Sequence, residues 1–168
     1  MKNLNIEEIS KFIARQSPET KIYLGADSVR VVIDGKAYAD ISVAVVVHIN
    51  GNNGCKVFGE ISRQPDYDKR KDKPMLRLIN EAIKVSELYS KIQDAIGDRH
   101  VEIHIDINKD PKFGSSCAIS EAMGYIRSTC FDKDGNPVTL RCKPDAPAAS
   151  FASDKILIDR QRFMSERE

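Results

Sequence analysis

A long amphipathic segment in the middle of the chain most constrains how these 168 residues can fold. From Pro74 to about Ile96, apolar side chains recur four and three residues apart, which predicts a long helix with one core-facing stripe. Glu81 falls inside that stripe, whereas Glu87 lies on the opposite side. A carboxylate that faces a core needs a proton, a partner or a metal ion, because desolvating an unpaired charge costs several kcal/mol or more.

Three strand-like segments precede this helix. The first runs from Lys21 to Ile33 and is followed by Asp34-Gly35, a hairpin signal. The second runs from Lys36 to about Ile49, and the third from Cys55 to Arg63, after a turn rich in Asn and Gly. These short turns predict an antiparallel meander of three strands.

A fourth strand follows the helix. The segment from His100 to Asn108 places Val and Ile on one face and Glu102, His104, Asp106 and Asn108 on the other. Since a helix crosses between it and the meander, we expect this strand to lie in the interior, parallel to the first strand.

The remaining elements complete an α/β domain. We expect an N-terminal helix within residues 1–18, a helix from Gly114 to about Ser128, a fifth strand from Val138 to Lys143, and a last helix capped by Ser150. The polar tail, 161–168, is expected to be frayed. The prediction is one domain over residues 1–168, with a mixed five-stranded sheet of three antiparallel and then two parallel strands, flanked by helices.

Four acids stand at special places in this order. Asp27 follows Gly25 on one side of the first strand, where both residue types weaken a strand. Asp106 ends the fourth strand, Glu81 faces the core, and Asp154 lies in the first turn of the last helix. Carboxylates from four elements suit Mg²⁺, a hard cation that prefers oxygen ligands. The alternative is that these acids cap helices and pair with Lys or Arg, which for Asp154 alone is a sufficient explanation.

This order of elements and acids resembles the ribonuclease H-like superfamily. The pieces GADS, HIDIN, GYIR, KPDAPAAS and ASDK resemble more narrowly its small YkuK-type branch. The resemblance implies that Asp27, Glu81, Asp106 and Asp154 are catalytic and hold two Mg²⁺ or Mn²⁺ ions for phosphodiester hydrolysis. It implies a nucleic-acid partner, namely RNA, an RNA:DNA hybrid or structured DNA.

The chain departs from the well-studied ribonucleases H in two places. The loop from Pro144 to Ala149 lacks the histidine that those enzymes often carry before the last helix. The helix that begins near Ser115 runs almost directly into the fifth strand, so no basic handle for RNA:DNA hybrids is present. Specificity for hybrids therefore does not follow from the resemblance.

Other polar residues lie beside the acids. Ser28, Asn108 and Lys143 are adjacent to them in the expected fold and are candidates to contact phosphate or ligand waters. His104 shares a face with Asp106, where it could orient a metal-bound carboxylate. A hydrogen-bonded interior histidine is the simpler interpretation.

The formal net charge is only +1, so nucleic-acid binding would require local patches. One candidate patch is the loop before the long helix, with Lys69, Arg70, Lys71 and Lys73. Alternatively, Asp66, Asp68 and Asp72 neutralise these bases and the loop is a solvated connector. The next candidates are Arg127, Arg141, Lys143 and Lys155.

Several classes are disfavoured by the sequence. The four cysteines form no CxxC pair, which predicts reduced thiols rather than a zinc site. No apolar run is long enough for a membrane span and no signal-peptide pattern begins the chain, so we expect a cytoplasmic protein without a membrane partner. A ribonuclease H-like module that binds without cleaving remains open as an alternative. An actin-like ATPase fits poorly, because GADSV is not a glycine-rich phosphate loop.

Overall fold

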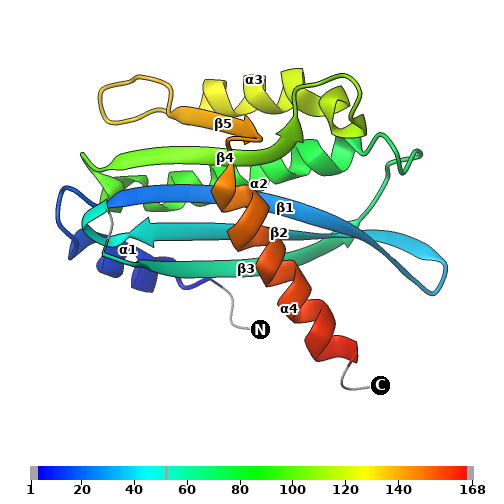
Figure 1. Cartoon of the computed structure of the whole chain (residues 1–168), viewed down its shortest axis with the longest axis horizontal. Helices are drawn as coiled ribbons and strands as arrows, with labels where there is room; N and C mark the ends of the chain where they lie inside the picture. Colours follow the sequence, from blue (N-terminus) through cyan, green and yellow to red (C-terminus); the bar gives the residue numbers. More distant parts are fainter. Residues whose placement is uncertain (1–3, 52, 166–168) are drawn as a thin grey trace.

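The computed structural model describes residues 4–51 and 53–165. Its elements are α1 (Ile6–Ala14), β1 (Lys21–Ile33), β2 (Lys36–His48), η1 (Ile49–Gly51), β3 (Cys55–Pro65), α2 (Met75–Ile96), β4 (His100–Asn108), η2 (Gly114–Ala118), α3 (Ile119–Thr129), β5 (Thr139–Lys143), η3 (Ala148–Ser153) and α4 (Asp154–Ser165). Figure 1 shows their arrangement around one sheet.

The sheet has five strands in the order β3-β2-β1-β4-β5, with β1 in the centre. β1 pairs antiparallel with β2, and β2 with β3, whereas β4 is parallel to β1 and β5 is parallel to β4. The predicted mixed sheet is therefore confirmed. In the β1–β4 register Gly25 lies opposite His104 and Ala26 opposite Ile105, so Asp27 and Asp106 both follow directly after the last paired residues.

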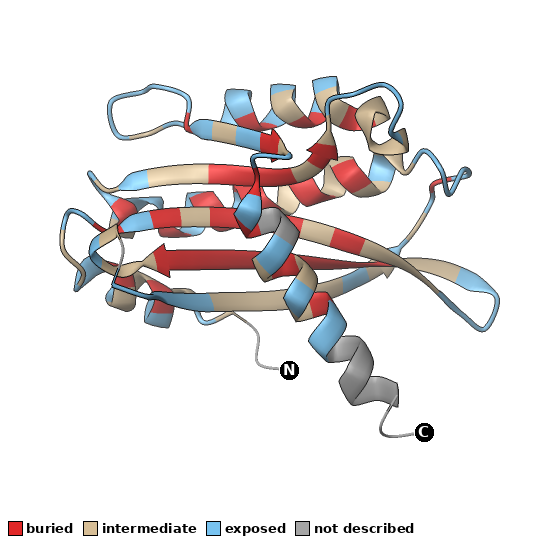
Figure 2. Cartoon of the chain, viewed as in Figure 1, coloured by how far each residue is buried: buried red, intermediate tan, exposed pale blue. Residues whose placement is uncertain are grey.

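Helices cover the two faces unequally. The helices α1, α2 and α3 lie on one face, whereas η3 and α4 cross the other (Figure 1). The core lies under α2, where the predicted stripe is buried together with Ile22, Leu24, Ile103 and Ile105. Figure 2 shows this burial running along β1, β2 and β4.

Local signals act as predicted at the first helix and the first hairpin. The Asn5 side chain accepts a hydrogen bond from the backbone N–H of Glu8 at 3.1 Å, which caps α1. Asp34 and Gly35 have φ values of 49° and 74°, as the tight turn between β1 and β2 requires. All four cysteines are free thiols, as predicted.

Two predicted details are wrong. A π-helical segment, η3, runs through Ser150 and leads directly into α4, so Ser150 does not begin the last helix. The helix expected from Gly114 starts as a 3₁₀ segment and becomes α-helical only at Ile119. The frayed tail over 161–168 stays a prediction: the backbone of α4 is helical to Ser165, and residues 166–168 lie outside the described part.

Within the described ranges, no helix combines the length and apolar character that a membrane crossing requires.

Candidate active site

Asp27 lies at the centre of the four acids. Its carboxylate accepts a hydrogen bond from the backbone N–H of Ser28 at 2.7 Å. Burial, followed by the charges of Asp106 and Asp154, raises the pKa of Asp27 from 3.8 to about 6, although the Ser28 N–H and the Lys143 ammonium oppose this shift. The structure therefore brings Asp106 and Asp154 close enough to Asp27 for their charges to act on it.

Glu81 approaches from α2, on the other side of the sheet. Its side chain is only 1% exposed, and one carboxylate oxygen accepts a hydrogen bond from the Ser28 hydroxyl. The other oxygen, Oε2, is buried and has no hydrogen-bond partner among the described residues. Burial first, and then the charge of Asp27, raise the pKa of Glu81 well above its usual value. This supports the inference that Glu81 is a buried acid in need of a proton or a cation.

Asp106 has a cation partner in this structure. The Lys143 ammonium lies 2.6 Å from one carboxylate oxygen of Asp106 and 2.8 Å from the other. A register irregularity between β4 and β5 brings Lys143 opposite Asn108, although Cys142 before it pairs with Ile105. Lys143 is therefore beside the acids, as the sequence suggested.

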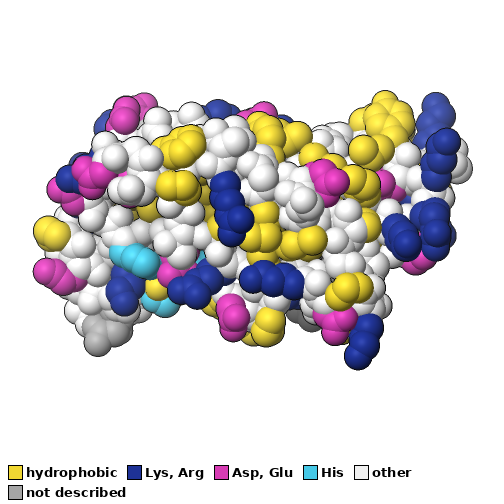
Figure 3. All heavy atoms as spheres, turned by 90° about the horizontal axis from the view of Figure 1, so that it is seen from above, with side chains coloured by type: hydrophobic (Ala, Val, Ile, Leu, Met, Phe, Trp, Pro, Cys, Tyr) yellow, Lys and Arg dark blue, Asp and Glu magenta, His cyan; other side chains and the backbone are white. Residues whose placement is uncertain are grey.

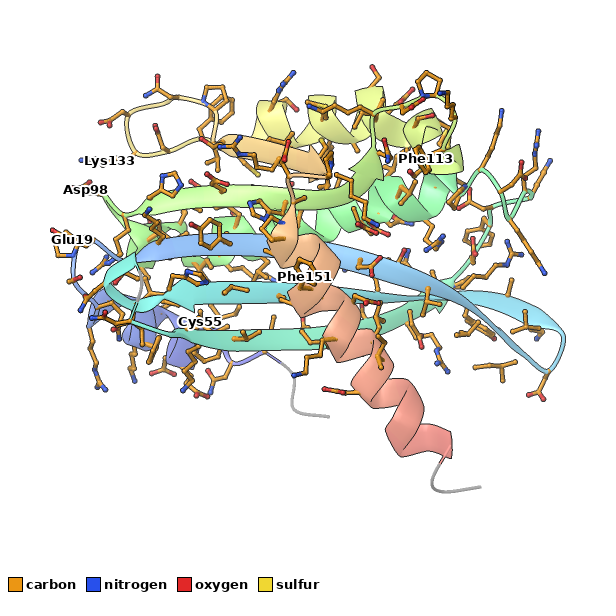
Figure 4. The ribbon with its side chains drawn as sticks, in the orientation of Figure 1. Glu19, Cys55, Asp98, Phe113, Lys133 and Phe151 are labelled. Carbon is orange, nitrogen blue, oxygen red and sulfur yellow. The ribbon has the colours of Figure 1, made fainter. Side chains whose placement is uncertain are left out.

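Asp154 is placed by the segment that precedes it. The carbonyl of Ser153 accepts a hydrogen bond from Ser42 of β2 at 2.9 Å, and the N–H of Ala148 donates one to His104 of β4 at 3.0 Å. Phe151 is 74% exposed and projects from η3 in front of the sheet (Figure 4). Because η3 continues directly into α4, Asp154 does not stand at a free helix start, and capping no longer explains it.

His104 does not contact Asp106 through either ring nitrogen. It is 1% exposed, its Nδ1 accepts from Ala148, and its Nε2 lies 3.0 Å from Glu102. The accepting Nδ1 assigns the proton to Nε2, so the neutral ring donates to Glu102. Burial lowers the pKa of His104, in agreement with a neutral ring. The interior-histidine interpretation is the one that the structure supports, and His104 anchors η3.

One further residue joins this cluster, whereas Asn108 does not. Arg77 donates from Nη1 to the Ser28 hydroxyl at 2.7 Å and to the Ser28 carbonyl. It stands one helical turn before Glu81 on α2. Side chains four residues apart on a helix are neighbours, so this spacing alone would have predicted that Arg77 lies beside Glu81. Asn108 is used locally instead: its side-chain oxygen accepts the N–H of Asp110 at 3.0 Å.

Each acid in the loop before α2 forms a hydrogen bond or an ion pair within the protein. Both carboxylate oxygens of Asp68 accept backbone N–H groups of α2, from Leu76 and Arg77, each at 2.9 Å. Asp66 faces Arg30, and Asp72 pairs with Arg70 at the exposed surface. Of the four loop bases, Arg70 forms an ion pair with a loop acid, Asp72. Figure 3 shows the Lys and Arg side chains that gather at this end of the molecule.

The donor set fits a hard divalent cation in charge and chemistry. Carboxylate oxygens dominate it. Burial first, and then the charges of neighbouring acids, raise the pKa values of Asp27 and Glu81, and Glu81 Oε2 is a buried acceptor without a partner among the described residues. Among the described residues no three His, Cys, Asp or Glu side chains are grouped closely enough to hold one ion. Metal binding would thus draw together carboxylates that repel one another in the metal-free protein.

Comparison with known families agrees with this geometry. A family model described as ribonuclease H-like, the YkuK-type family, matches residues 5–157. The chain belongs to the ribonuclease H-like family. Searches among curated proteins and among solved structures found no significant match. Membership of this family agrees with the mixed sheet, in which Asp27 and Asp106 follow directly after the last residues that β1 and β4 pair with each other.

Proposed function

We propose that this ribonuclease H-like protein hydrolyses phosphodiester bonds of RNA, an RNA:DNA hybrid or structured DNA with two Mg²⁺ or Mn²⁺ ions. The observation that carries the proposal is the gathering of buried acids around Asp27, where Glu81 Oε2 is buried without a hydrogen-bond partner among the described residues. Burial first, and then the charges of Asp106 and Asp154, raise the pKa of Asp27; burial first, and then the charge of Asp27, raise that of Glu81. Buried carboxylates that repel one another are costly to a fold unless a cation is bound. A cytoplasmic location stays a prediction from the composition.

In this proposal Asp27, Glu81, Asp106 and Asp154 hold the two ions. When bound, such a pair activates the attacking water and stabilises the leaving oxygen. Lys143, whose side chain is 41% exposed, neutralises Asp106 and is positioned to contact a phosphate oxygen. The η3 segment and His104 keep Asp154 in place, and Ser28 with Arg77 keeps Glu81 in place.

A second candidate function is binding without cleavage. It is favoured by the Asp106–Lys143 ion pair and by the absence of a three-acid group at ligand distance among the described residues. In that case the acids are structural, and Asp106 serves mainly to pair with Lys143.

Cleavage assays separate the two candidates. Purified protein is incubated with end-labelled RNA, RNA:DNA hybrid, and single-stranded and branched DNA, in Mg²⁺, Mn²⁺ or EDTA. The nuclease proposal predicts products that depend on the metal ion and disappear in EDTA. Binding to any of these substrates with intact strands under all three conditions would favour the module.

Gly59 offers a test of how Asp154 is positioned. A Cβ at Gly59 would overlap the Ile156 side chain of α4 and lie 3.0 Å from the Val43 carbonyl oxygen. We expect Gly59→Ala to displace α4 and slow cleavage roughly tenfold, about 1.4 kcal/mol in the barrier. Gly124→Ala is the matched control, because nothing lies within 4 Å of its added Cβ. Equal rates for the two variants would show that β3 does not position Asp154.

The bases in the loop before α2 predict that nucleic-acid binding weakens as the salt concentration rises. Each phosphate that a base neutralises releases counterions, so affinity falls with salt in proportion to the number of contacts. Replacing Lys69, Arg70, Lys71 and Lys73 with Ser should weaken binding to RNA and to matched DNA alike and flatten the slope of affinity against salt. Affinities measured in EDTA at several salt concentrations test this. An unchanged slope would leave the loop as a connector and direct attention to Arg127, Arg141, Lys143 and Lys155.

A further inference from the structure

The edge of the sheet formed by β3 is long and regular. β3 is the outermost strand on its side, and it pairs with β2 over eleven residues without a register shift. The strand contains one proline, Pro65, which is its last residue. The opposite edge, β5, has five residues and an irregular register. Proteins protect open edges with devices such as short strands, bulges and internal prolines, because an open edge pairs readily with another strand. β3 has none of these three.

The alternation of hydrogen bonds decides which residues of β3 face outward. At one end of the β2–β3 pair the N–H of Ile49 donates to the Gly54 carbonyl at 3.0 Å. At the other end the N–H of Asp66 donates to the Ala37 carbonyl at 3.0 Å. Bonded and non-bonded pairs alternate along an antiparallel ladder, so the even-numbered residues of β3 bond to β2. The N–H and C=O groups that point away from β2 belong to Cys55, Val57, Gly59, Ile61 and Arg63.

The side chains of β3 are complementary to a second copy of the same strand. If two copies pair antiparallel about a two-fold axis at Phe58, Lys56 of each copy lies opposite Glu60 of the other. Phe58 then lies opposite Phe58 of the second copy. Opposite charges and facing aromatic rings both stabilise an antiparallel pair, most closely at the non-hydrogen-bonded positions that these residues occupy. Lys56 is exposed, and its ammonium lies 4.9 Å from the ring centre of Phe12 and 5.0 Å from that of Phe58.

Neighbouring registers lose this complementarity. The outward-facing groups can bond across the edge only when the axis passes through a residue of β3. An axis through Gly59 places Lys56 opposite Ser62, which removes the ion pair. An axis through Glu60 places the two Glu60 side chains directly opposite each other, where like charges destabilise a sheet. The charges therefore select the axis at Phe58.

The last helix also extends toward this edge. α4 crosses β3 at Gly59, whose missing side chain leaves room for Ile156. Its backbone then continues past β3, so its last turns have no described strand of this chain beneath them (Figure 1). A second copy in the register given above would supply its own β3 there. Val57 of that copy, which is 46% exposed in the single chain, lies opposite Gly59 and beneath α4.

We propose that the protein forms a symmetric dimer in which β3 pairs antiparallel with β3 of a second copy, with the two-fold axis at Phe58. The two sheets then join into one continuous sheet, and both α4 helices lie on the same face of it. The inference is independent of the proposed function, because it uses neither the acids of the candidate site nor a metal ion.

Charge reversal tests the interface in the full-length protein. Sedimentation over a wide range of concentrations should give the mass of a dimer for the unmodified protein. Lys56→Glu and Glu60→Lys should each raise the dissociation constant of the dimer at least roughly tenfold, because each places like charges opposite one another twice. The two changes combined should restore it, since the pair is re-formed with its signs exchanged. Loss of the contact of Glu60 with the Leu4 N–H would not be restored in this way.

The matched control is Lys133→Glu. Lys133 is an exposed base in the turn before β5, at the opposite edge of the sheet (Figure 4), and its reversal should leave the dissociation constant unchanged. A monomer at every concentration would overturn the inference and leave the edge to a strand of another protein. A dimer that neither single reversal weakens would also overturn it.

A disulfide tests the register. In protein that carries Cys55→Ser, Phe58→Cys should form an intermolecular disulfide on mild oxidation, because the two thiols lie opposite each other at a spacing that a disulfide can bridge. Ser62→Cys in the same background is the control, since its two copies lie far apart along the paired strands. Cross-linking of both variants, or of neither while the dimer persists, would overturn the axis at Phe58.

Discussion

Asp27→Asn is expected to reduce metal-dependent cleavage by roughly a thousandfold, about 4 kcal/mol in the barrier, while the protein stays folded. Asparagine has nearly the same shape, but it removes the charge that the acids share. Asp106→Asn should lower the rate similarly, although it also leaves Lys143 without its carboxylate. Rates in Mg²⁺ and in Mn²⁺ measure this, with circular dichroism to check the fold. Retained cleavage would remove Asp27 from the site.

The same substitution should stabilise the metal-free protein at high pH. The pKa of Asp27 is raised from 3.8 to about 6, so the folded state favours the protonated form. The contribution of Asp27 to the free energy of unfolding is therefore fully present below pH 4 and is lost as the pH rises through about 6. The shift corresponds to about 3 kcal/mol, so Asp27→Asn should raise Tm at pH 8 by roughly 5 °C or more.

Thermal unfolding in EDTA at pH 4 and pH 8 tests that sign. The gain should be present at pH 8 and nearly absent at pH 4, where Asp27 of the folded unmodified protein is largely protonated and carries no more charge than the asparagine of the variant. Equal Tm changes at the two pH values would mean that repulsion and burial do not perturb Asp27.

Glu81→Gln is expected to slow cleavage to a similar extent, and Glu87→Gln is its control. Glu81 is buried with an unpartnered Oε2, whereas Glu87 is on the exposed side of the same helix and pairs with Lys84. Glu81→Gln should abolish cleavage and, since the pKa of Glu81 is raised well above its usual value, also stabilise the metal-free protein at neutral pH.

Glu87→Gln should change neither rate nor stability measurably, because an exposed ion pair contributes little. Cleavage and thermal unfolding of the two variants, measured side by side, give the comparison. If both variants cleave like the unmodified protein, Glu81 is not needed for cleavage.

Elements with strong periodicity were predictable from the sequence. The apolar stripe of α2 and the alternation in β4 are set by burial on one face, so they identified both elements and placed Glu81 in the core. The pairing of β4 parallel to β1 followed from the crossover helix. These features of the sequence predict that Asp27 and Asp106 lie together.

Contacts between distant segments were not predictable in the same way. The cap of α2 comes from Asp68, outside the usual N-cap position, and η3 is held by Ser42 and His104 from two strands. No local pattern encodes such partners, because they depend on how the chain returns to the sheet. The sequence pattern therefore predicts Ser150 as the cap of the last helix, although the backbone there is already helical.

The most direct test of the two-metal account is anomalous diffraction from crystals soaked in Mn²⁺. The account predicts two strong peaks among Asp27, Glu81, Asp106 and Asp154, and their loss in the Asp27→Asn protein. The absence of any peak beside Asp27 or Asp106 after a soak at a saturating Mn²⁺ concentration, with Lys143 still paired to Asp106, would contradict the account.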